Sequence, residues 1–355
     1  MTAHENPLHP FSLELDMLAG MLNFEIADDP HYSGLEIQSF DDPKHGTGML
    51  VFLNRRGDGR VDVYLEPGLQ HIDPANYAIG NGLGEWIETE FEKCSLDISD
   101  TGVNAETRFT DIDGRLIEVQ ASDRTPRGRR TAAFLAPMGA AIAKPTSLPL
   151  IWMSKFDLLR RSGPSPLVRI DGRPAKLGRL PAEWLTRRRL IKVTSDLCSI
   201  AVNPTPAQPA TLEPGGQEVE VSDIGTTAVV GEAADHLVRF EFDPPFPDLR
   251  EHPESGHGRW SIAIDGKRTI SGDWNLNQSN GQMVVALEVT EGWRPKGLPL
   301  LMTIVTRVAA VFRTWPTTYR WRAAIGMEEH PEVTSAWERT ENDGGESYRS
   351  LTGSD

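Results

Sequence analysis

The stretch Glu106–Ser122, ETRFTDIDGRLIEVQAS, decides the fold class of this chain. Two short runs that contain Val, Ile, Phe and Thr flank the pair Asp113-Gly114, which supplies the positive φ angles of a tight hairpin turn. The same pattern occurs in Trp260–Trp274, WSIAIDGKRTISGDW, and in Trp274–Val289, WNLNQSNGQMVVALEV, which continue one another. The sequence therefore predicts antiparallel hairpins arranged as a meander.

Alternation along the strands supports the same fold class. In the segment 60–66, RVDVYLE, every second residue is apolar and the others form one polar face. This pattern is typical of antiparallel sheets with one solvated side, whereas buried parallel strands read as continuous apolar runs. No GxGxxG or GxxxxGKS/T motif occurs, so neither a dinucleotide-binding fold nor a P-loop fold is indicated.

A composition break at residues 203–216, NPTPAQPATLEPGG, marks the predicted domain boundary. Proline lacks a backbone donor, so a run this rich in proline favours a spacer over a sheet interior. We expect an N-terminal β-barrel-like domain over 1–202, a linker over 203–216 and a C-terminal β-barrel-like domain over 217–325. Residues 326–355 are polar and rich in Glu, Ser and Gly, which predicts a disordered tail.

One late α-helix is predicted between Leu301 and Phe312, where apolar residues recur at helical spacing. A strand is the alternative there, because Val, Ile and Thr are β formers. Pro316 ends the helix, and residues 319–325 are predicted to form a closing strand. The expected fold is therefore all-β, with two antiparallel barrel-like domains and one late helix.

Charge and targeting signals restrict the partners. The 355 residues carry a formal net charge of −15, which disfavours nucleic acid and an anionic membrane surface, because Lys and Arg bind both. The most apolar run, Leu298–Phe312, is shorter than the roughly 20 residues of a membrane span and includes Arg307. The first 20 residues lack the basic and apolar regions of a secretory signal. Cys94 and Cys198 form no CxxC pair, so a reducing, cytoplasmic setting is predicted.

The polar face of the segment 60–66 is the first candidate site. If it points into a barrel, Asp62, Tyr64 and Glu66 line a cavity, and a desolvated carboxylate there has a raised pKa suited to proton transfer. Asp62 and Glu66 are then the predicted catalytic residues, and Tyr64 contacts the ligand. Exposure of the whole face to solvent is the alternative.

A second candidate site lies in the segment 147–163, SLPLIWMSKFDLLRRSG. Trp152 and Phe156 beside Arg160 offer apolar walls with a charged group, as small-molecule pockets require, although core packing is the alternative. Trp274 completes the predicted ligand-binding set. The acidic run around Trp86 lacks the Asp, Asn and Gly spacing of a calcium loop, and no HExxH motif occurs, so neither a metal nor another cofactor is expected.

Two all-β domains, Asp-Gly hairpins, a proline-rich linker and a late helix before a final strand are together similar to the two-domain lipocalin-like family. That family includes carotenoid 1,2-hydratase-like and AttH-like proteins. The resemblance covers the layout of about residues 30–325, and Gly34-Leu35-Glu36-Ile37 stand where the tryptophan doublet of the family is expected. It implies a cavity for an apolar small molecule, in some members with hydration, cyclisation or isomerisation chemistry.

The leading hypothesis is that the chain binds a hydrophobic small molecule in or between its β domains. If it is an enzyme, we expect a lyase or isomerase that uses acid–base chemistry without a cofactor. A non-catalytic β module that binds another protein is one alternative. A carbohydrate-active protein is the other, since nine Trp and many carboxylates suit sugar stacking and acid–base pairs. The oligomeric state is left open.

Overall fold

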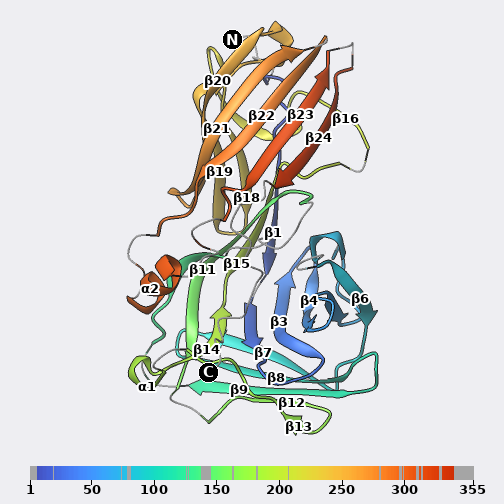
Figure 1. Cartoon of the computed structure of the whole chain (residues 1–355), viewed down its shortest axis with the longest axis vertical. Coiled ribbons are helices and arrows are strands. Elements are labelled where there is room, and N and C mark those ends of the chain that lie inside the picture. The colour runs from blue at the N-terminus through green and yellow to red at the C-terminus, as the bar shows by residue number, and fades with distance from the viewer. Residues whose placement is uncertain are drawn as a thin grey trace. The chain divides into compact units, whose positions relative to one another are not determined.

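The computed structural model describes residues 6–339 apart from short gaps (Figure 1). The gaps are residues 19, 73, 78–80, 125, 127, 137–144, 162–163, 181–182, 207, 280, 296–297, 299, 309–311, 313–314 and 328–329. Strands make up 62% of the structure and helices 6%, and its sheets are curled. The all-β prediction is therefore confirmed.

The chain divides into two compact units, which are described separately. Unit 1 comprises the described residues of Met1–Asp16, Leu135–Trp152 and Cys198–Gly345. Unit 2 comprises those of Met17–Phe134 and Met153–Leu197. This division differs from the predicted boundaries, because residues 203–216 lie inside unit 1 and Leu135–Trp152 leaves the predicted N-terminal domain. The chain passes from one unit to the other several times, and composition alone cannot show this.

Unit 2 contains two sheets. One runs in the order β14 (Arg188–Thr194), β2 (Gly20–Glu25), β3 (Tyr32–Asp42), β4 (Gly46–Arg55), β5 (Val61–Leu65) and β6 (Leu83–Glu88). The other runs in the order β13 (Arg173–Pro174), β12 (Leu167–Ile170), β9 (Leu116–Arg124), β8 (Gly102–Thr110) and β7 (Lys93–Ser99). Short helices η1 (Pro74–Tyr77) and α1 (Glu183–Thr186) lie in its connections.

Four further strands belong to the sheet of β2. They are β1 (Leu13–Leu18), β10 (Ala132–Ala136), β11 (Leu148–Arg160) and β15 (Leu197–Val202). Each contains a point where the chain passes from one unit to the other.

Unit 1 is built on one antiparallel sheet of nine strands. Their order is β16 (Ala210–Thr211), β24 (Glu332–Arg339), β23 (Tyr319–Gly326), β22 (Gln282–Glu291), β21 (Lys267–Ser279), β20 (Ser255–Ile264), β19 (His236–Phe246), β18 (Gly225–Ala233) and β17 (Glu218–Ser222). In this sheet β17 to β24 form a meander, and β16 pairs with β24 at one edge. Helix α2 (Leu300–Val308) and the 3-10 turn η2 (Leu249–Glu251) lie in its connections. The late helix is thus confirmed for Leu300–Val308, whereas residues 309–311 of the predicted range lie outside the described residues.

The predicted hairpins form where Asp-Gly pairs supply the turn. Asp265 and Gly266 join β20 to β21 with φ angles of 51° and 71°, and Asp171 and Gly172 join β12 to β13 with 52° and 75°. Positive φ at both central residues matches the right-handed twist of the flanking strands. Gly114, with φ of 80°, joins β8 to β9 in the stretch that decided the fold class.

The predicted disordered tail needs a correction, because residues 332–339 form β24. This strand pairs with β23 along its length and with Ala210 and Thr211 of the predicted linker. Trp337 is 3% exposed, and its indole N–H donates to the carbonyl oxygens of Val202 and Asn203 at 3.1 and 2.9 Å. The tail prediction failed because Trp337 and Val333 are buried against unit 1, which a polar composition does not reveal.

The expectation of one solvated face on the segment 60–66 is also wrong. All five residues of β5 are buried, and β5 pairs with β6 in parallel instead of antiparallel. The outer face is covered because Phe52, Tyr77 and Trp86 stack in a row over it, with ring centroids 5.4 and 5.7 Å apart.

The two sheets of unit 2 enclose one hydrophobic core. Its members come from both sheets, among them Leu22, Ile37 and Val51 on one side and Val103 and Val119 on the other. Residues two apart on a strand share a face, so these alternating positions define the inner rows of the sheets. No helix among the described residues has the length and apolarity needed to cross a bilayer.

Candidate functional site

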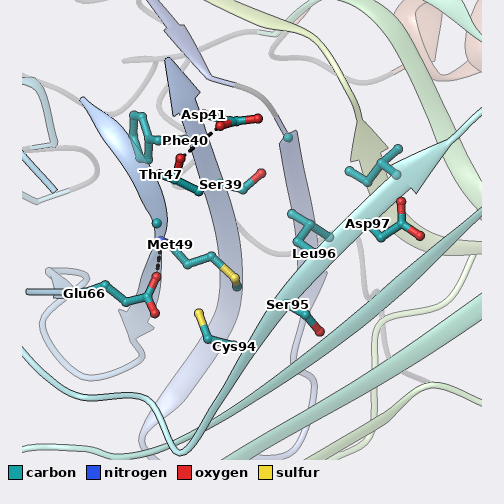
Figure 2. Close-up of a pocket in the computed structure, with 13 residues that line it drawn as sticks. Ser39, Phe40, Asp41, Thr47, Met49, Glu66, Cys94, Ser95, Leu96 and Asp97 are labelled. Carbon is teal, nitrogen blue, oxygen red and sulfur yellow. Dashed lines mark hydrogen bonds between the residues drawn. The ribbon is translucent and has the colours of Figure 1, made fainter. Parts of the chain in front are cut away.

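The candidate site is a cavity in unit 2 between β7 and the strands β2 to β5. Its volume is about 390 Å³, which lies within the range of about 300–1,000 Å³ that is common for small-molecule sites. Figure 2 shows side chains from β3, β4 and β7 and from the end of β5 around it. The site is therefore a property of one unit and needs no residue from the other.

The cavity forms where the inner row of β3 changes from apolar to polar. Leu35 and Ile37 are fully buried in the core, and the next two positions on the same face are Ser39 and Asp41. Small polar side chains do not fill the space between the sheets as Leu and Ile do, so the packed core ends and a cavity begins.

Glycines keep the space open on the two strands that flank β3. A Cβ atom at Gly20 would lie 2.8 Å from the Ser39 hydroxyl oxygen, and one at Gly48 would lie 3.2 Å from a Glu66 carboxylate oxygen. The row Cys94, Leu96 and Ile98 of β7 forms the facing wall and packs against the core.

Glu66 is the most firmly held polar group of the cavity. Its Oε2 accepts the backbone N–H of Met49 at 2.7 Å, and its own N–H donates to the Met49 carbonyl oxygen at 3.0 Å. Figure 2 shows the Glu66 carboxylate pointing toward the cavity with the Met49 and Cys94 side chains beside it. Two hydrogen bonds with the Met49 backbone thus fix the direction of this carboxylate.

Cys94 lies close enough to Glu66 for the two groups to interact. Burial raises the pKa of the Cys94 thiol, and the negative charge of Glu66 raises it further. The thiol is therefore neutral near pH 7 and a poor nucleophile.

The charge of the lining is acidic. Its acidic residues are Asp41, Glu66 and Asp97, and none of its residues is Lys, Arg or His. Asp97 is paired with Arg124 at 2.5 Å. Asp41 instead accepts the Thr47 hydroxyl at 3.0 Å, and within the described part of the chain neither Asp41 nor Glu66 forms an ion pair with a basic residue.

A second hollow continues the cavity past Glu66. It measures about 340 Å³ and shares Thr47 and Glu66 with the first. Leu69 and Phe91 add apolar surface, and Glu90 adds a carboxylate. Glu66 therefore stands where the two hollows meet.

Asp62, the first predicted catalytic residue, lies outside both hollows. Its side chain is 1% exposed, which also excludes the solvated alternative. Arg55 donates through Nε at 2.8 Å and through Nη2 at 2.7 Å, and the Glu85 backbone N–H donates at 2.9 Å. Asp62 thus joins β4, β5 and β6, and its catalytic role stays a prediction that this geometry does not favour.

Tyr64 is fully buried in the core of unit 2. Its ring packs on Phe109 at 4.9 Å, and its hydroxyl oxygen accepts the Ile112 N–H at 3.2 Å. Burial raises its pKa to about 12. Glu66 is therefore the one member of the predicted acid and tyrosine set that lines the cavity.

The remaining predicted ligand residues are not brought together. Trp152 and Trp274 belong to unit 1, where Trp152 donates to Asp265 at 3.2 Å and Trp274 packs on Phe246 at 5.1 Å. In unit 2, Phe156 stacks on Phe134 at 4.6 Å. Arg160 is bound by Asp123 at 3.0 Å. Neither hollow includes any of the four residues, so core packing and ion pairing account for their positions.

Sequence reasoning missed Asp41, Thr47 and Cys94. Cys94, Leu96 and Ile98 alternate with the polar residues Ser95 and Asp97, and this pattern could have placed the Cys94 thiol on an inner face of the sheet. No pattern within the sequence of β7 or β3 shows that these two strands lie opposite one another across the cavity. Among the described residues no group of three or more His, Cys, Asp or Glu could hold a metal ion.

No family model, curated protein or solved structure matches this chain. The likeness to the two-domain lipocalin-like family therefore remains an expectation from layout.

Proposed function

We propose that the protein binds a small molecule with an apolar body and a positively charged amine in the cavity of unit 2. The observation that carries this proposal is the position of Glu66, an acidic group without a basic partner among the described residues, beside the apolar side chains of Met49 and Leu96. A carboxylate that is partly removed from water gains most from a cation that forms a charge-assisted hydrogen bond.

The composition of the lining supports this ligand class over the alternatives. Met49, Leu96 and Ile98 supply apolar surface for the body of the ligand. No tryptophan occurs among the described lining residues, so the residue type on which the carbohydrate alternative depended does not contribute to either hollow. A binding function needs no proton transfer and is the simpler role for a carboxylate that backbone contacts hold in place.

We also propose a cytoplasmic location. Both cysteines are free, Cys94 half-buried and Cys198 buried, and free thiols suit a reducing compartment.

The proposal is tested by calorimetric titration of the full chain with decylamine and with decanol, which share an apolar body and differ in charge. We expect decylamine to bind at least about tenfold more tightly, because a hydrogen bond to a charged group contributes about 1.5–3 kcal/mol. Glu66→Gln keeps the acceptor for Met49 and should remove this preference while it leaves decanol binding unchanged.

Glu88→Gln is the matched control, since Glu88 is an exposed acid of the same unit outside both hollows. It should bind both probes as the wild type does. Equal affinity for the two probes, or an unchanged preference in Glu66→Gln, would refute the proposal.

A further inference from the structure

Helix α2 turns an aliphatic stripe toward solvent. Leu300, Ile304 and Val308 follow one another at intervals of four residues, so at about 3.6 residues per turn they lie on one face. Their exposed fractions are 78%, 50% and 70%. Large aliphatic side chains are usually buried, and a contiguous exposed set of them marks an interaction surface.

The opposite side of α2 is attached to the protein. Met302 lies about half a turn away from the centre of the stripe and is 8% exposed. The burial of Met302 shows that α2 packs on the protein through this side, while the stripe stays exposed.

The charge around α2 is opposite to that of the whole chain. Residues 292–318, GWRPKGLPLLMTIVTRVAAVFRTWPTT, include Arg294, Lys296, Arg307 and Arg313 but no acid, although the net charge of the protein is −15. Arg294 and Arg307 are exposed, and neither forms an ion pair with another residue that the structure describes. An acid-free basic segment in so acidic a chain is a local signal that the net charge conceals.

We infer that α2 docks on the surface of a lipid bilayer that contains anionic phospholipids. An exposed aliphatic stripe in a segment whose charged residues are all basic is the pattern of helices that lie in the bilayer interface. Arg307 precedes Val308 and flanks the stripe, so its aliphatic stem can follow the apolar face while its guanidinium reaches a phosphate. The rest of the chain is repelled by the same surface, which directs α2 toward it and keeps the attachment reversible.

The test is co-sedimentation of the full chain with vesicles of phosphatidylcholine alone and of phosphatidylcholine mixed with phosphatidylglycerol. The attractions of several basic residues to an anionic surface add together, so we expect binding to the mixed vesicles to be at least about tenfold stronger. High salt should remove most of this difference, because the surface potential is screened.

Variants identify the surface that binds. Ile304→Ser combined with Val308→Ser should lower the affinity for mixed vesicles by about tenfold or more, because two exposed aliphatic groups no longer enter the bilayer. Arg307→Gln should weaken binding to mixed vesicles by about fivefold and leave the weak binding to neutral vesicles unchanged. Ile224→Ser is the control, because Ile224 is 67% exposed in the turn between β17 and β18.

Three results would overturn the inference. The first is equal binding to neutral and mixed vesicles, and the second is wild-type binding by the double variant. The third is a protein that binds neither kind of vesicle but elutes as a dimer that the double variant dissociates. In that case the stripe is a contact between two copies of the chain.

Discussion

The Asp62 carboxylate receives donors from both neighbouring strands. Arg55 of β4 holds both of its oxygens, and the Glu85 backbone N–H of β6 adds a third hydrogen bond. Asp62 is 1% exposed, whereas the Arg55 side chain is 28% exposed and keeps part of its hydration. Removing the buried charge leaves a partly buried cation without its main partner, which costs more than the loss of a surface ion pair.

We therefore expect Asp62→Asn to lower the free energy of unfolding by about 2 kcal/mol, measured by urea denaturation. Asp58→Asn is the matched control, because the same Arg55 lies 3.7 Å from an Asp58 side chain that is 47% exposed. The control should unfold at nearly the wild-type urea concentration. A wild-type midpoint for Asp62→Asn would show that the Arg55 contact is not a source of stability.

At the scale of elements, the N-terminal segment before β1 belongs to the core of unit 1. Phe11 packs among aromatic side chains of β19, with ring centroids 4.6 Å from Phe242 and 4.7 Å from Phe246. His9 stacks on Phe11 at 6.0 Å, and its Nδ1 accepts the Phe11 N–H at 3.3 Å. Protonation of Nδ1 would remove this acceptor.

Burial lowers the pKa of His9 from 6.5 to about 4, against a weaker opposing effect of the Asp248 charge. Between about pH 6.5 and pH 4 the unfolded chain binds a proton that the folded chain does not, so stability is lost as the pH falls through this window. Over the whole of this window the free energy of unfolding falls by about 3 kcal/mol because of His9.

We expect the free energy of unfolding of the wild type to fall more steeply from pH 7 to pH 4.5 than that of His9→Asn. Asparagine keeps an acceptor for Phe11 but does not titrate in this range. His31→Asn removes an exposed histidine and should follow the wild-type curve. Parallel curves for the wild type and His9→Asn would contradict the assignment.

At the scale of the whole molecule, neither unit is one continuous piece of chain. Unit 1 needs the N-terminal segment, Leu135–Trp152 and the C-terminal sheet together. The segment 217–325, predicted as a domain, lacks Phe11, β16 and β24, so the rings of β19 lose their packing partner and β23 loses a neighbouring strand.

We expect the isolated fragment 217–325 to show no cooperative unfolding transition in urea, followed by tryptophan fluorescence. The full chain under the same conditions should show one, because its sheet is complete. A sharp transition in the fragment would restore the boundary that the proline-rich segment 203–216 suggested.

The sequence by itself determined the features that depend on near neighbours. Asp-Gly pairs set hairpin turns through positive φ, period-two alternation predicted strands, and helical spacing predicted the helix near Leu301. Each signal acts over a few residues, so no distant partner was needed to interpret it.

Only the tertiary structure decided which faces are covered and which residues meet. The polar face of β5 enters the core because β6 and the row of Phe52, Tyr77 and Trp86 close its other side. The cavity depends on β7 facing β3 and β4, and the stripe of α2 is exposed although its spacing is that of a core helix. Burial is a relation between distant segments, and a strand or helix pattern shows that two faces differ without showing what will cover either of them.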